Sequence, residues 1–164
     1  MTTFKSVFAI IGMTGSLALS SVTPQSQAVS IQEPVVVQPT MAQTLQTLSL
    51  PERRVLVRER INQLTKEAGI EHKAEEVYTT IAKCENIGLE PTLQSGHRYK
   101  SDNPKWGTKA GDQELSFGLA MIHLPSHPEV TKEQAQDPDF ALRWMVDEFA
   151  QGNEWQWTCW RSFY

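Results

Sequence analysis

The chain has 164 residues, which is enough for one domain with its own core and too few for two domains of ordinary size. Its 15 Lys and Arg residues are outnumbered by 19 Asp and Glu residues, and the formal net charge is −4. Because phosphate backbones bind basic surfaces, this balance argues against nucleic acid as a partner.

The first 28 residues have the order of a secretory signal peptide. Lys5 precedes an apolar stretch diluted by Gly and Ser, and the small residues Ser26 and Ala28 stand at the −3 and −1 positions of a cleavage site. An uncleaved membrane anchor is the alternative, but it needs about 20 strongly apolar residues. We therefore expect export to the periplasm, the cell envelope or the extracellular space, with no stable membrane span after cleavage.

Residues 29–50 contain two Pro, several Gln and Thr, and one charge, which predicts a linker. The folded domain is then expected to cover residues 51–164. Helical spacing of apolar residues predicts one helix from Pro51 to Gly69 and a second that ends near Gly88. The inward stripe of the second helix leads to Cys84 and Glu85.

Residues 89–115 are interrupted by Gly and Pro and predict a loop, with a possible short strand at 97–100. The apolar segment 115–124 predicts a buried helix of two to three turns. Thr131 and Gln134 predict the capping box of a small helix, and Asp137 with Pro138 predicts the start of the last clear helix. These elements give a mainly helical domain with a small loop and strand region.

The chain has two cysteines, Cys84 and Cys159. In an oxidising compartment such a pair favours one disulfide, and closing so long a loop stabilises the fold by about 4 kcal/mol. Two buried thiols are the alternative. Neither cysteine has a second Cys or a His at ligand spacing, so the sequence predicts no metal site.

Glu85 is an acid on the face that its helix is expected to turn inward. Burial disfavours an ionised carboxylate, so at the wall of a cleft its pKa would rise, and a protonated carboxyl could donate to a leaving oxygen. The alternative is a helix-end glutamate that points to solvent and pairs with Lys83 or Arg98.

Four segments together resemble the lysozyme-like domains of lytic transglycosylases. They are VRERINQLTKEAGIEHKAEEVYTTIAKCENIG, ELSFGLAMIHLPSHPEVT, DPDFALRWMVDEFAQG and WQWTCW, in that order. In that family a helix ends in a Cys-Glu-Ser motif whose Glu is the catalytic acid, and the Cys before the acid pairs with a late Cys. The resemblance implies an α+β lysozyme-like fold, Glu85 as the catalytic acid and a Cys84–Cys159 disulfide.

The resemblance also assigns the second segment to the glycan cleft. Ser116 matches the Ser of the family's Ser-aromatic-Gly motif, which faces the cleft. Met121 stands where the family usually has Gln, and His123 stands where Asn is common. Gln94, Tyr99 and Lys100 in the preceding loop are further candidates for contact with substrate, as is Trp106, whose flat ring suits a pyranose face.

The family cleaves the β-1,4 bond between N-acetylmuramic acid and N-acetylglucosamine in peptidoglycan, and one acid/base suffices. The resemblance therefore implies peptidoglycan strands as partner and neither metal nor cofactor; we expect a monomer. A lysozyme-type hydrolase is the alternative, and it usually needs a second carboxylate, for which Glu90, Asp112 and Glu114 are candidates. A non-catalytic glycan-binding domain, favoured by Met121, and an exported domain that binds a protein through its aromatic tail are the other hypotheses.

Overall fold

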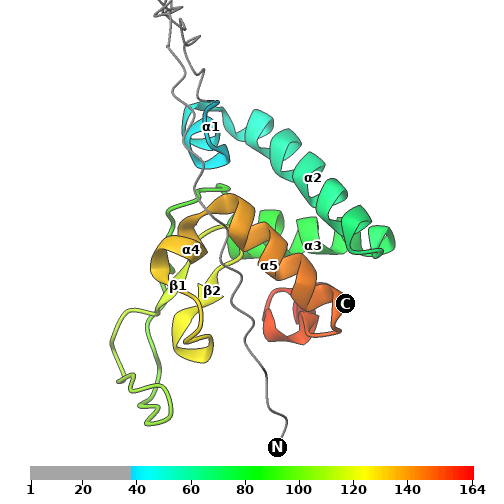
Figure 1. Ribbon diagram of the computed structural model, residues 1–164. Coiled ribbons are helices and arrows are strands. Elements are labelled where there is room, and N and C mark those ends of the chain that lie inside the picture. Colours follow the sequence, from blue (N-terminus) through cyan, green and yellow to red (C-terminus); the bar gives the residue numbers. More distant parts are fainter. Residues whose placement is uncertain (1–37) are drawn as a thin grey trace, which may run out of the picture. The chain divides into compact units, whose positions relative to one another are not determined.

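A computed structural model describes residues 38–164, and the expected signal peptide (1–28) lies outside the described residues. Within that range the chain is mainly helical, with few strands and one disulfide (Figure 1). The helices are α1 (Met41–Thr47), α2 (Leu50–Glu67), α3 (Ala74–Thr80), α4 (Lys132–Gln136), α5 (Pro138–Ala150) and α6 (Trp160–Phe163), and the strands are β1 (Ser116–Phe117) and β2 (Ile122–His123).

Residues 41–50 differ from the expected linker because they hold α1 and the start of α2. Thr40 and Gln43 cap α1 reciprocally, and the Leu45 side chain is fully buried in the core. A helix of seven residues with one buried position carries too little periodicity to be recognised in the sequence. The folded part therefore begins before residue 51, while residues 29–37 lie outside the described residues.

The helix α2 forms where the sequence predicts it. The Ser49 backbone N–H donates to Glu52 Oε2 at 2.8 Å, which satisfies a donor at the helix start, and Pro51 occupies the first turn. Val57, Ile61 and Leu64 are buried along one face, and α2 packs against α3 and α5 (Figure 1). Each of these side chains contributes about 1.5–3 kcal/mol through removal of apolar surface from water.

The helix α5 supplies the other half of the core. The carboxylate of Asp137 accepts the Phe140 N–H at 2.9 Å, and Pro138 fits the first helical position. Helix α5 packs against α1, α2, α3 and α4. Its buried face joins the rest of the core through Ala141, Leu142, Met145, Val146 and Phe149.

The helix predicted over residues 115–124 is wrong, because this segment forms a hairpin. Strands β1 and β2 pair antiparallel, with Ser116 opposite His123 and Phe117 opposite Ile122. The four-residue loop between them starts and ends in the left-handed region, with φ of 78° at Gly118 and 48° at Met121. A short apolar run fits a buried strand as well as a buried helix, and the loop decides which forms.

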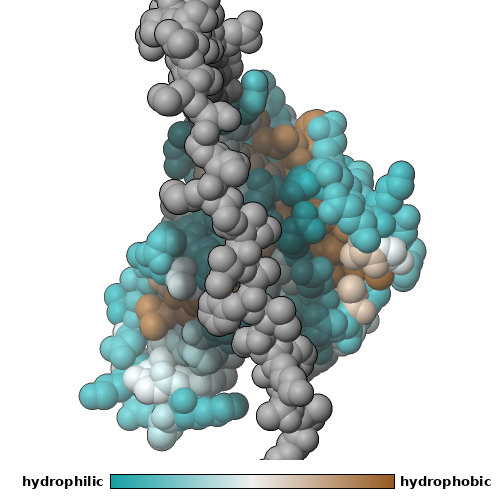
Figure 2. All heavy atoms as spheres, viewed as in Figure 1, coloured by the Kyte–Doolittle hydropathy of each residue, from teal (hydrophilic) through white to brown (hydrophobic). Residues whose placement is uncertain are grey.

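Where Figure 2 leaves the described residues uncovered, hydrophilic residues predominate, and hydrophobic residues are visible near α1 and α2. Among residues 38–164, no helix combines the length and the apolar composition needed to cross a membrane.

Candidate active site

Glu85 lies in a π-helical turn that extends α3. This turn spans Ile81–Glu85, and the Asn86 N–H donates to the Ile81 carbonyl at 2.9 Å, five residues back. Single π-helical turns in α-helices occur frequently at functional sites. The turn leaves Cys84 exposed, Glu85 half-buried and Asn86 buried. The sequence predicts that positions 84 and 85 both face inward, and of the two only Glu85 is partly buried.

The surroundings of Glu85 favour its protonated form. Burial is the largest cause that raises the pKa of this carboxyl, and the nearby charge of Glu114 raises it further. Two effects lower the pKa: the Cys159 backbone N–H, which donates to Glu85 Oε1 at 3.4 Å and is second only to burial, and the imidazole of His97, which is the smallest of the four causes. The net direction is upward, which leaves a carboxyl able to donate a proton at a higher pH than an exposed glutamate.

Glu114 is the carboxylate that the fold brings near Glu85. Its two oxygens accept different hydroxyls, Oε2 from Ser95 at 2.8 Å and Oε1 from Ser116 at 3.0 Å. Both serines are buried, so their hydroxyls hold the carboxylate in one orientation. A fixed carboxylate next to a carboxyl with a raised pKa is an arrangement that can separate acid and base roles.

The two other candidate second acids lie elsewhere. Glu90 forms an ion pair with Arg53, and Asp112 is exposed and accepts the Lys109 N–H at 3.3 Å within a turn. Neither contributes to the raised pKa of Glu85, whereas Glu114 does. Glu114 is therefore the candidate that the structure brings into the site.

Gln94 and Ser116 belong to the site as supports for Glu114. The Gln94 side-chain amide donates to the Glu114 carbonyl at 3.2 Å, and Gln94 forms an isolated antiparallel β-bridge with Phe117. The Ser116 hydroxyl donates to the Glu114 carboxylate, and Ser116 is only 4% exposed, so its expected place at the glycan cleft stays a prediction. Met121 ends the hairpin loop in a left-handed conformation and is partly exposed.

Tyr99 and His123 form a second cluster beside Glu114. Tyr99 Oη lies 2.8 Å from His123 Nε2 and accepts the Leu115 N–H at 3.1 Å. His123 Nδ1 lies 2.7 Å from the Ser126 hydroxyl, and the exposed ring of Trp106 meets the imidazole edge-on at 4.8 Å between centroids. Burial is the largest cause that lowers the pKa of His123. The negative charge of Glu114 raises this pKa, so the His123 imidazole and the Glu114 carboxylate influence each other.

Lys100, predicted in the same loop, is exposed.

The disulfide Cys84–Cys159 forms as predicted, with a sequence separation of 75 residues and a Cα–Cα distance of 5.8 Å. It ties the residue before Glu85 to the C-terminal segment, whose Trp157 indole N–H donates to the Ala120 carbonyl in the hairpin loop at 2.8 Å. The disulfide thus brings the Cys159 N–H to the carboxyl and fixes the backbone next to it.

Replacement of both cysteines by serine is expected to lower the free energy of unfolding by about 4 kcal/mol, because the unfolded chain regains the freedom of a long closed loop. Urea denaturation of the double variant, with the single variant Cys84→Ser as a second sample, measures this loss. A loss below about 1 kcal/mol would contradict the assigned role of the crosslink.

Replacement of Glu114 by Gln is expected to lower the pKa of Glu85, because it removes a charge that raises it. The value should stay above that of an exposed glutamate, since burial is the larger cause. Carbon NMR titration of the Glu85 carboxyl measures the shift, and Glu59→Gln, a change to an exposed acid of α2, serves as control. An unchanged midpoint in Glu114→Gln would show that the two carboxyls do not interact.

Four contributors to the site have no signal in the sequence. They are the Ser95 hydroxyl, the His97 imidazole, the Ser126 hydroxyl and the Cys159 backbone N–H. Ser95, His97 and the Cys159 N–H act on residues far away in the chain, and Ser126 contacts His123 three residues away across an irregular turn; neither periodicity nor a short motif encodes these contacts.

A groove of about 380 Å³ lies apart from these residues, lined by α1, α2 and α5. Within the described range, no group of three or more His, Cys, Asp or Glu side chains is arranged to hold a metal ion. No protein-family model, curated protein or solved structure matches the chain.

Proposed function

We propose that this protein cleaves peptidoglycan strands, with Glu85 as the catalytic acid on a lysozyme-like domain of the lytic transglycosylase type. The observation that carries the proposal is the half-buried Glu85 carboxyl, whose pKa is raised mainly by burial. It stands directly after a disulfide-bonded cysteine, as the resemblance implies. The order of the four resembling segments gives further support.

In the proposed reaction Glu85 donates its proton to the glycosidic oxygen between N-acetylmuramic acid and N-acetylglucosamine. The bond from C1 to that oxygen breaks through an oxocarbenium-like transition state. The Glu85 carboxylate then takes the proton of the muramic 6-hydroxyl, whose oxygen bonds to C1 and closes a 1,6-anhydro ring. No water is consumed, and Glu85 ends the cycle protonated.

A lysozyme-type hydrolase is the second candidate, and Glu114 is the observation that favours it. A carboxylate held beside the acid could direct a water molecule or stabilise the developing positive charge. The hydroxyls of Ser95 and Ser116 occupy one position on each oxygen of Glu114, which suits stabilisation of charge better than removal of a proton.

The proposal includes export to the periplasm, the cell envelope or the extracellular space. Disulfides persist in oxidising compartments, and the Cys84–Cys159 bond is consistent with one. The expected signal peptide is part of this proposal.

Digestion of purified peptidoglycan, with products weighed by mass spectrometry, tests the function. A lytic transglycosylase releases anhydro-muropeptides, and a hydrolase releases products heavier by one water. Absence of products from folded, oxidised protein would overturn the enzyme proposal for this substrate. Binding to the glycan without cleavage would then favour the non-catalytic alternative, to which Met121 points.

A further inference from the structure

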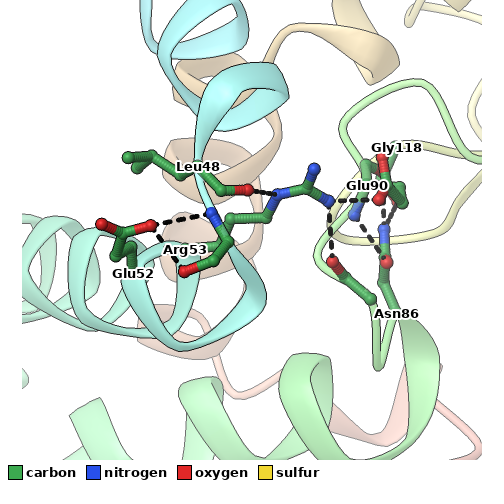
Figure 3. Close-up of polar contacts among 8 residues, drawn as sticks. Leu48, Glu52, Arg53, Asn86, Glu90 and Gly118 are labelled. Carbon is green, nitrogen blue, oxygen red and sulfur yellow. Dashed lines mark hydrogen bonds and ion pairs between the residues drawn. The ribbon is translucent and has the colours of Figure 1, made fainter.

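Arg53 of α2 joins the N-terminal helices to the loop after Glu85 (Figure 3). Its Nε donates to the Leu48 carbonyl at the end of α1 at 3.0 Å, and Nη1 donates to the Gly88 carbonyl at 3.2 Å. The same guanidinium forms an ion pair with Glu90. The Arg53 side chain is 13% exposed, and a guanidinium cannot lose its charge, so its burial depends on these acceptors.

Asn86, the residue next to Glu85, extends this contact to the hairpin. Its side-chain nitrogen donates to the Glu90 carbonyl at 2.8 Å and to the Gly118 carbonyl at 3.1 Å, while its side-chain oxygen accepts the Glu90 N–H at 2.9 Å. Asn86 is 1% exposed, so each of these bonds replaces one with water. Figure 3 shows the dashed lines that run from the Asn86 amide to Glu90 and Gly118.

The segment that Arg53 and Asn86 hold, residues 86–90, is a turn that would not be stable alone. Leu89 has a φ of 51°, which costs a non-glycine residue about 1–3 kcal/mol. Its side chain is fully buried, and its N–H donates to the Asn86 carbonyl at 2.9 Å. The surrounding contacts therefore keep the turn in this conformation, and Arg53 supplies two of them, to Gly88 and Glu90.

We infer that Arg53 is a positioning residue for the site: through the 86–90 turn and Asn86 it fixes the backbone on which Glu85 stands and the hairpin loop that starts at Gly118. Glu85 is thus held from both neighbours, by the disulfide at Cys84 and by the Arg53 contacts at Asn86. This role rests on the proposed function for its catalytic consequence, but not for its effect on the 86–90 turn.

The test compares Arg53→Gln with Arg143→Gln in the full chain. Arg143 pairs with Glu67 on the surface, with side chains 52% and 45% exposed, and is the matched control. In Arg53→Gln we expect amide hydrogen exchange about tenfold faster at residues 86–90 and 118–121. The pKa of Glu85 should fall toward that of an exposed glutamate, because a looser turn admits water. On soluble glycan strands, kcat should fall about tenfold with KM little changed.

Two further variants keep the test decisive if Arg53→Gln does not fold. Glu90→Gln removes the ion pair and leaves both carbonyl contacts of Arg53, so smaller changes in the same directions are expected. Arg53→Lys keeps the charge without the forked donors and should restore the wild-type behaviour only in part.

Failure of this inference is distinguishable from failure of the proposed function. If wild type cleaves no glycan, the proposed function fails, while hydrogen exchange and the Glu85 titration still decide the role of Arg53. If exchange at 86–90 and the Glu85 pKa in Arg53→Gln match those of Arg143→Gln, the positioning role is overturned even where the wild type is active.

Discussion

Replacement of Glu85 by Gln is expected to reduce peptidoglycan cleavage about a thousandfold, since a positioned general acid typically contributes between a hundredfold and ten-thousandfold. The amide has nearly the shape of the carboxyl and still accepts the Cys159 N–H, so the fold should remain. Release of muropeptides, quantified by mass spectrometry, measures the loss. Glu59→Gln is the control, and cleavage by Glu85→Gln within about threefold of wild type would remove Glu85 from the mechanism.

The same substitution has an expected effect on stability with a definite sign. The pKa of Glu85 is raised in the folded state, so its favourable contribution is present below the unfolded-state pKa and is lost as pH rises through the folded-state value. At neutral pH an unfolded-state glutamate is ionised, so folding must either bury that charge or take up a proton at Glu85, and both cost free energy. At neutral pH Glu85→Gln should therefore unfold at a higher urea concentration than wild type, and the difference should vanish in acid. A variant less stable than wild type at neutral pH would contradict this account.

Replacement of Gly118 by Ala is expected to lower the free energy of unfolding by at least about 4 kcal/mol, in the range that marks a severe structural conflict. A Cβ at this position would lie 1.7 Å from the Ala135 carbonyl oxygen and 2.8 Å from its carbon. These are backbone atoms next to the end of α4, so no side-chain rotation relieves the overlap. The φ of 78° adds strain for any residue with a side chain.

The Gly111→Ala variant separates the two causes of the stability loss in Gly118→Ala, which are steric overlap and backbone strain. Gly111 has a φ of 88°, and in the described part of the chain no heavy atom lies within 4 Å of the place that a Cβ would take. The substitution should therefore cost only the backbone strain, about 1–2 kcal/mol. Urea denaturation of both variants measures the difference. Equal losses in Gly118→Ala and Gly111→Ala would mean that contact with Ala135 does not constrain the hairpin.

The long helices could be predicted from the sequence, and the hairpin could not. Helices α2 and α5 carry apolar stripes over several turns and clear caps, so local pattern and tertiary packing agree. The segment 115–124 is apolar without a period, and its conformation depends on Gly118 lying against Ala135. That contact involves a residue outside the segment, which no local pattern reveals.

The disulfide of the candidate site can be predicted from the sequence, whereas its polar contacts can be predicted only in part. The cysteine pair and the inward acid Glu85 follow from the sequence, and Glu114 is one of three candidate second acids. The π-helical turn shifts Cys84 outward and buries Asn86, a change of register that an ideal helix does not predict. The contacts of Arg53 to residues 88 and 90 depend on tertiary packing and are visible only in the structure.

The pH dependence of kcat/KM on soluble glycan strands, set beside the carbon NMR titration of the Glu85 carboxyl, tests the central claim most directly. The claim is that burial keeps Glu85 protonated so that it can act as the acid. We predict that the rate falls as pH rises through the same midpoint at which the carboxyl ionises, and that this midpoint lies above that of an exposed glutamate. A carboxyl that ionises in the ordinary range, or a rate that stays constant across its ionisation, would contradict the account.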